Sequence, residues 1–127
     1  MFKLRYYCRG EGKEEIAKLL TNIREKCGIT YEISDLSRNG AYDEEKEKEV
    51  YERNFKPRAK VLKKRTGEPI TQLRSRGARH YFVSLPGTIA IIRDKEIEWY
   101  TLGDEEITKF LKAVLRKGYA YLEEYCK

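Results

Sequence analysis

One cysteine near the N-terminus, Cys8, is the residue best placed for nucleophilic chemistry. It ends a run of strand-forming residues, and the basic residues Arg9 and Lys13 follow it where a helix is expected to begin. Positive charge and a helix N-terminus both stabilise a thiolate, the nucleophilic form of cysteine. The alternative is a half-buried strand cysteine that packs as a small apolar side chain. We expect a thiol that is either unreactive or has an ordinary pKa of about 8.5.

The turn after Cys8, Gly10-Glu11-Gly12-Lys13, has two glycines at a strand-to-helix junction. Amide groups at a helix N-terminus favour phosphate, so this turn is a candidate anion cradle. The GxxxxGK[ST] spacing of a P-loop is missing, and an ordinary glycine turn explains the same residues. The cysteines and acidic residues of the chain show no metal-ligand spacing, so we expect neither a metal nor a cofactor.

Basic residues gather between Arg53 and His80, where ten lysines and arginines face one acidic residue, Glu68. This segment carries a charge of +9, so the rest of the chain carries −3 within the net +6. Arginine binds phosphates through two parallel hydrogen bonds and stacks on bases, and aromatic neighbours add stacking. We therefore predict that residues 53–82 bind nucleic acid or another polyanion; the alternative is an ion network with the acidic residues of 43–52. The candidate contacts are Arg58, Lys60, Lys63, Lys64, Arg65, Arg74, Arg76, Arg79 and Tyr81.

The first 36 residues predict a strand, a helix and a second strand. Residues 3–8 are rich in strand formers, and apolar residues alternate with polar ones from Ile29 to Ile33, in a strand that runs to Leu36. Strands joined by a helical crossover should be parallel. Between them, one face of a helix carries the apolar series Ile16, Leu19, Leu20, Ile23 and Cys27, and Gly28 closes it.

The rest of the chain predicts helices, a hairpin and a last helix within one domain, residues 1–127. The helices come first, within a basic insertion at about 40–80. The expected elements are a charged helix over 43–55, a helical turn from Pro57 that ends at 66–69, an exposed loop over 74–78, a strand over 81–85, strands over 88–93 and 96–101 joined by Asp94-Lys95, a helix from Asp104 interrupted at Lys117-Gly118, and a tyrosine-rich tail.

The stretch Leu85-Pro86-Gly87-Thr88-Ile89-Ala90-Ile91-Ile92, with the order β-α-β, helical insertion, β-β-α, resembles the thioredoxin fold over about residues 1–36 and 80–116. The resemblance implies a three-layer α/β domain with a mixed central sheet and a structural loop at Leu85 and Pro86. It also implies a cis peptide between these two residues, and a trans bond would remove the assignment. The first and last helices would then end together, with Cys27 and Cys126 either in a disulfide or, as we favour, as free thiols.

The Cys-x-x-Cys pair of that family is missing, because its position falls near the Gly10–Lys13 turn. We therefore expect a non-redox scaffold that acts as a binding module. Residues 56–69 also faintly resemble the helical insertion of the arsenate-reductase branch, which has one nucleophilic cysteine after its first strand. The resemblance thus provides an enzyme alternative: a single-cysteine thiol oxidoreductase or reductase that uses Cys8 opposite the Leu85-Pro86 loop.

A third and weaker reading is a small RNA-cleaving toxin, because such proteins are also short and basic, with arginines and a histidine on a sheet. The βαβ beginning argues against it. No stretch of about 18 apolar residues is present and the N-terminus is charged, so we expect a cytoplasmic protein without a membrane span. Abundant Lys and Glu with few Asn and Gln is a composition typical of hyperthermophilic archaea.

Overall fold

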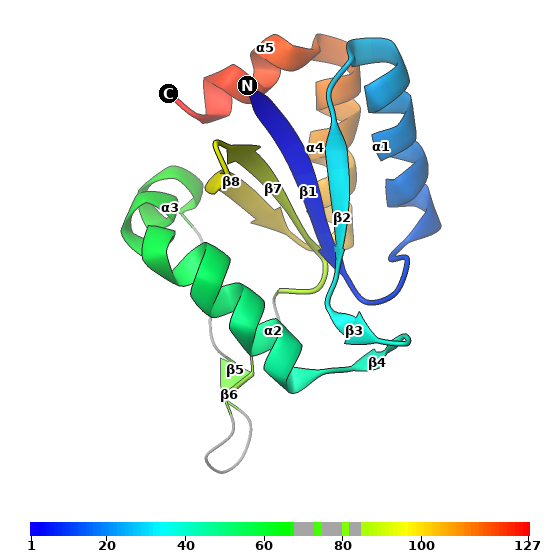
Figure 1. Cartoon of the computed structure of the whole chain (residues 1–127). Coiled ribbons are helices and arrows are strands. Elements are labelled where there is room, and N and C mark those ends of the chain that lie inside the picture. Colours follow the sequence, from blue (N-terminus) through cyan, green and yellow to red (C-terminus); the bar gives the residue numbers. More distant parts are fainter. Residues whose placement is uncertain (68–72, 75–79, 82–84) are drawn as a thin grey trace.

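The computed structural model describes residues 1–67 and 85–127, and the backbone of residues 73–74 and 80–81. Its centre is a four-stranded sheet in the order β2-β1-β7-β8 (Figure 1). β1 pairs in parallel with β2, and β7 is antiparallel to both β1 and β8. The predicted α/β class, the mixed sheet and the parallel pairing of the first two strands are confirmed. The strands are β1 (Phe2–Cys8), β2 (Tyr31–Asp35), β7 (Thr88–Arg93) and β8 (Glu96–Leu102).

Two long helices, α1 (Glu14–Cys27) and α4 (Asp104–Lys117), lie side by side on one face of the sheet (Figure 1). Their apolar residues pack on alternate residues of β1, which include Leu4 and Tyr6. Gly28 ends α1 in the left-handed conformation, as predicted. The chain after Gly118 forms a further helix, α5 (Tyr119–Tyr125), where the sequence suggested only a tail.

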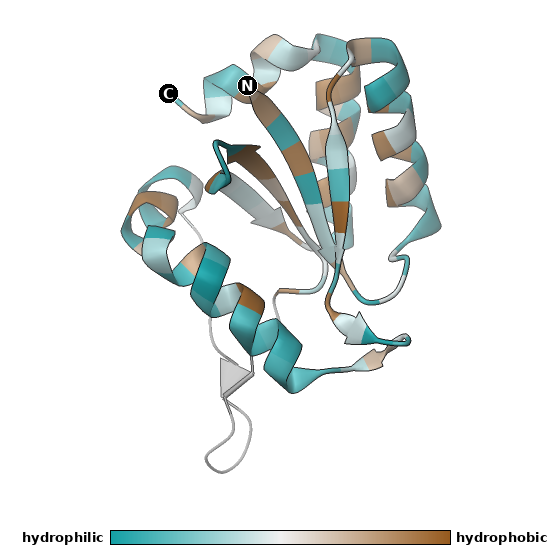
Figure 2. Cartoon of the chain, viewed as in Figure 1, coloured by the Kyte–Doolittle hydropathy of each residue, from teal (hydrophilic) through white to brown (hydrophobic). Residues whose placement is uncertain are grey.

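A continuous helical segment, residues 44–66, covers the opposite face, and Phe55 and Leu62 pack there against Tyr7 and Tyr100. Figure 2 shows this segment as mostly hydrophilic, with a few apolar residues. Pro57 has no amide hydrogen to donate, and the helical hydrogen-bond pattern changes around it from π to 3₁₀. The segment consists of α2 (Glu44–Val50), η1 (Tyr51–Phe55), η2 (Lys56–Arg58) and α3 (Ala59–Thr66).

Short antiparallel pairs complete the fold. β3 (Ser37–Arg38) and β4 (Ala41–Tyr42) flank a turn at residues 39–40, where Asn39 and Gly40 have φ of 53° and 84°. β5 (Leu73–Arg74) pairs with β6 (His80–Tyr81), so the predicted loop does not include residue 74. The rest of that loop, 75–78, lies outside the described residues, as do positions 82–84 of the predicted strand.

The predicted cis peptide between Leu85 and Pro86 is wrong: the described residues contain no cis peptide, and this bond is among them. The loop is held in another way. The Gly87 amide donates to the Tyr7 carbonyl at 2.7 Å, and the Gly103 amide donates to the Gly87 carbonyl at 3.0 Å. Backbone hydrogen bonds to β1 and to the start of α4 therefore fix this connection. No helix in the described part of the chain is long and apolar enough to cross a bilayer.

Candidate functional site

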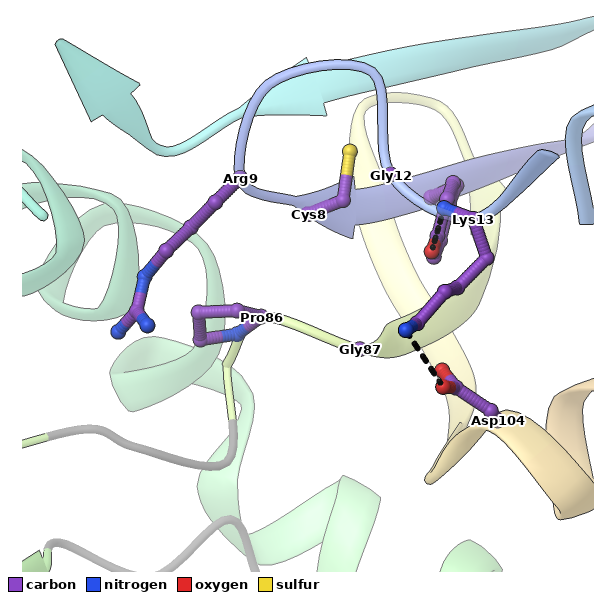
Figure 3. A pocket seen from close by; sticks show the side chains of 8 residues that line it. Cys8, Arg9, Gly12, Lys13, Pro86, Gly87 and Asp104 are labelled. Atoms are coloured by element: carbon purple, nitrogen blue, oxygen red, sulfur yellow. Dashed lines mark hydrogen bonds and ion pairs between the residues drawn. The ribbon is translucent and has the colours of Figure 1, made fainter. Parts of the chain in front are cut away.

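A cavity of about 460 Å³ lies where β1 ends, beside the first residues of α1 and α4. We call it the β1 cavity. Figure 3 shows the turn after Cys8 on one side and the Pro86–Gly87 loop on the other. The lining residues are Tyr6, Cys8, Arg9, Gly12, Lys13, Pro86, Gly87 and Asp104.

Cys8 borders this cavity but is buried, with 2% of its surface exposed. Its sulfur lies 3.5 Å from the Gly10 carbonyl and points toward the 10–12 turn rather than toward Pro86 (Figure 3). Burial, and then the charge of Asp35, raises the pKa of the Cys8 thiol to about 11. Arg9 and Lys13 do not offset these effects, so the geometry favours the packing interpretation of Cys8 over the nucleophilic one.

The turn over residues 10–13 does not offer a free anion cradle, because three of its amides, those of Gly10, Gly12 and Lys13, have internal partners. The Gly10 amide donates to Asp35 Oδ1 at 2.8 Å and to Ser37 Oγ at 3.1 Å. The Gly12 amide donates to the Arg9 carbonyl at 3.3 Å. These contacts support the interpretation as a structural turn.

Gly12 and Tyr6 fit together closely at this turn. Gly12 has φ of +72°, and a Cβ added to it would lie 2.4 Å from the Tyr6 ring. The Tyr6 hydroxyl accepts the Lys13 amide hydrogen at 3.2 Å. The glycine therefore permits both the left-handed backbone and the position of the tyrosine beneath it.

A buried carboxylate orients Arg9. Glu47, on α2, is 1% exposed, and its Oε1 accepts from Arg9 Nε at 2.9 Å. Burial raises the pKa of Glu47, and Arg9 opposes that shift. The Arg9 guanidinium also lies 4.8 Å from the Tyr42 ring centroid. The sequence analysis missed this pair, because Glu47 lies among six charged or polar neighbours and nothing in the pattern marks it as buried.

Of the three arginines in the first part of the basic segment, two point inward, whereas Arg53 is exposed and pairs with Glu49 of α2 at 2.8 Å. Arg58 and Arg65 both contact the carboxylate of Glu98 on β8, together with Arg93, and Arg58 also pairs with Glu96 at 3.1 Å. The Glu98 residue is 3% exposed. It has no partner on β7, where Ile91 lies opposite Trp99 and Ile92 opposite Ile97, so it is the extra residue of a β-bulge. Arg53 thus meets an acid of 43–52, as the ion-network alternative predicted, whereas the acids that hold Arg58 and Arg65 are on β8.

The lysines of the same segment point outward. Lys56, Lys60, Lys63 and Lys64 are exposed, and none forms an ion pair within the described residues. Their spacing of 0, 4, 7 and 8 places them on one side of the helical segment. We call these four residues the lysine face.

The remaining predicted contacts are not brought to the lysine face. Arg74 lies in β5 and Tyr81 in β6, and Figure 1 places both strands near α2, at the other end of the helical segment from α3. Arg76 and Arg79 lie outside the described residues.

The other two cysteines are free thiols in the structure. Cys27 Sγ lies 3.7 Å from the Leu115 carbonyl. Cys126 is 6% exposed, and burial raises its pKa to about 11. Of the two arrangements considered, free thiols are the one observed.

Comparison with curated proteins and with solved structures finds no match. A family model described as "Domain of unknown function (DUF8045)" matches residues 4–117. The match covers the sheet except for the first two residues of β1, together with the helical segment, the β1 cavity and the lysine face. The chain therefore belongs to the DUF8045 family.

Proposed function

We propose that this domain is a binding module for nucleic acid, or for a polyanion of similar charge density, and that the lysine face contacts the phosphates. The observation that carries the proposal is the division of the basic segment. Arg58 and Arg65 are held by Glu98, whereas the four lysines are exposed without ion pairs in the described part of the chain.

Lysine suits this role because its ammonium group is a strongly hydrated point charge that stays in water. Lys56 and Lys60 are one helical turn apart, about 6 Å along the axis, so neighbouring lysines can contact successive phosphates. Such contacts do not read the base sequence. We therefore expect binding that depends on salt and has little sequence preference.

The test is fluorescence anisotropy with a labelled 20-nucleotide single strand and its duplex, at several salt concentrations. For four to six phosphate contacts, the slope of log affinity against log salt is expected at about −3 to −5. Replacing Lys60, Lys63 and Lys64 with alanine should flatten the slope by about two units. The control replaces Lys18, Lys109 and Lys112, which are also exposed but lie on α1 and α4, and should change the slope little.

A second triple variant, Arg74, Arg76 and Arg79 to alanine, measures the contribution of the 73–81 region. A flatter slope in this variant would extend the binding surface beyond α3. Absence of any wild-type binding at about 50 mM salt contradicts the proposal, since electrostatic contacts are strongest at low salt.

The enzyme alternative receives no support from the geometry of Cys8, whose thiol is buried, has a raised pKa and points away from Pro86. The β1-α1-β2 beginning weighs against the RNA-cleaving toxin.

The order β1-α1-β2, helical segment, β7-β8-α4 agrees with the resemblance to the thioredoxin fold. The trans bond before Pro86 meets the condition set above for removing that assignment, and the cysteine pair is missing, so the proposed function does not depend on a thioredoxin-like scaffold.

A further inference from the structure

We infer that the β1 cavity binds a small molecule through a phosphate or carboxylate group. This inference is independent of nucleic-acid binding, because the lysine face does not line the cavity. The volume of about 460 Å³ lies within the range of about 300–1,000 Å³ that small-molecule sites occupy.

Arg9 is the group that would hold the anion. Its Nε donates to the buried Glu47, which fixes the direction of the side chain. Figure 3 shows the Arg9 side chain extending from the turn after Cys8 toward the side of the loop that carries Pro86, and both residues line the cavity. Two N–H groups of a guanidinium match two oxygens of a phosphate or carboxylate, so an arginine held by its Nε is preorganised for such a group.

Two further groups can complete the contacts. Lys13 lies on the other side of the Pro86–Gly87 loop (Figure 3), and its Nζ is 4.0 Å from Asp104 Oδ2. Both side chains are more than half exposed, so this ion pair is weak and an incoming anion can compete for the ammonium group. The Tyr6 hydroxyl accepts from the Lys13 amide and can donate its own proton at the same time.

The floor between Arg9 and Lys13 is the Pro86–Gly87 loop. It is anchored through the Gly87 amide and carbonyl to β1 and to the start of α4. Nothing lies within 4 Å of the position that a Cβ on Gly87 would take, so a ligand can approach the backbone closely there.

The charges around the cavity predict a modest affinity. Glu47 balances Arg9, and Asp104 lies near Lys13, so the attraction comes from directed hydrogen bonds rather than from a net positive charge. For inorganic phosphate we expect a dissociation constant of about 1–10 mM. A larger phosphate- or carboxylate-bearing molecule that fills the cavity should bind more tightly.

The test is a titration of ¹⁵N-labelled protein with inorganic phosphate and, separately, with acetate, at constant ionic strength set by chloride. The two probes distinguish the two anion chemistries. Saturable shifts are expected for the amides of Lys13 and Gly87 and for Arg9 Nε. Lys13→Met should weaken binding at least about fivefold, because the exposed lysine is removed from the cavity. Arg9→Lys keeps the positive charge but removes the two parallel N–H groups of the guanidinium, so it should weaken phosphate binding by a similar factor.

The matched control is Lys18→Met, which removes a similarly exposed lysine from α1, just after Lys13 but outside the cavity, and should leave the dissociation constant unchanged. The Lys60, Lys63 and Lys64 triple variant should also bind phosphate normally, which separates this site from the lysine face. Absence of saturable shifts up to about 50 mM of either anion, or equal weakening by Lys13→Met and Lys18→Met, overturns the inference.

Discussion

Glu98→Gln is the substitution that should most directly test what holds the helical segment on the sheet. The change keeps the size of the side chain and removes its charge. In the wild type, the Glu98 carboxylate is 5% exposed and lies among Arg58, Arg65 and Arg93. Two of these arginines come from the helical segment, so the substitution weakens contacts that join this segment to β8.

The three arginines will not lose the same amount of interaction energy when the charge of Glu98 is removed. The Arg93 side chain is 43% exposed and can be solvated instead, and Arg58 keeps its ion pair with Glu96 at 3.1 Å. Arg65 is 23% exposed and forms no other ion pair in the described part of the chain, so it bears most of the loss. A hydrogen bond to a charged group contributes about 1.5–3 kcal/mol, and breaking a buried pair costs about 3–5 kcal/mol. Because the arginines are partly exposed, we expect a loss of about 2–3 kcal/mol.

The assay is urea unfolding followed by the fluorescence of Trp99, the one tryptophan of the chain. A loss of this size corresponds to a melting temperature lower by roughly 10 °C for a domain of this length. The matched control is Glu96→Gln on the same strand, which removes a carboxylate that is 58% exposed and should cost less than about 0.5 kcal/mol. Amide exchange should accelerate in α3 and not in α1. Equal losses in the two variants would refute the assigned role of Glu98.

Three other perturbations have definite expected outcomes. In native protein at pH 8, Cys8 should react with a disulfide reagent far more slowly than Cys8 in unfolded chain, since its pKa of about 11 leaves little thiolate; a thiolate signal below about pH 7 would contradict this. Gly12→Ala should lower the free energy of unfolding by about 2–4 kcal/mol, because of the clash with Tyr6 and the positive φ. Gly10→Ala has a positive φ as well but no close neighbour, so it should lower the free energy of unfolding by only about 1 kcal/mol, and calorimetry of the two variants compares these losses. Asp35→Asn should destabilise the protein at pH 7, because hydrogen bonds from the Ser37 side chain and amide lower the pKa of the folded carboxyl. The stability that these hydrogen bonds add is present above the pKa of Asp35 in the unfolded chain and is lost as pH falls through its pKa in the folded protein. Wild type and variant should therefore converge in stability in acid unfolding curves taken to about pH 2.

The order and type of the main elements could be predicted because each has a local cause. Apolar residues at helical spacing set α1 and α4, and Asp94 and Lys95 adopt positive φ in the two-residue turn between β7 and β8. The prediction of a cis peptide before Pro86 was wrong for the opposite reason. It was carried over from a resemblance, and nothing local in the loop required it.

The candidate site was only partly predictable. The sequence pointed to the turn after β1, but it could not show that the amides of this turn bind Asp35, Ser37 and Arg9. Glu47 lies 38 residues from Arg9, and only the tertiary fold, which brings α2 to the residue after β1, puts them in contact. A bulge places Glu98 inward, which breaks the alternation on which a strand prediction depends.

The basic segment shows why a count of charges overestimates a binding surface. Its lysines and arginines look equivalent in a net charge, but the planar and weakly hydrated guanidinium tolerates partial burial and binds a carboxylate through several donors. Arg58 and Arg65 accordingly meet Glu98, whereas Lys56, Lys60, Lys63 and Lys64 stay in water. The surface that can bind phosphates through this stretch is therefore set by the four lysines. Exchanging Arg65 for lysine should weaken the docking of α3 without adding a phosphate contact, because residue 65 faces β8.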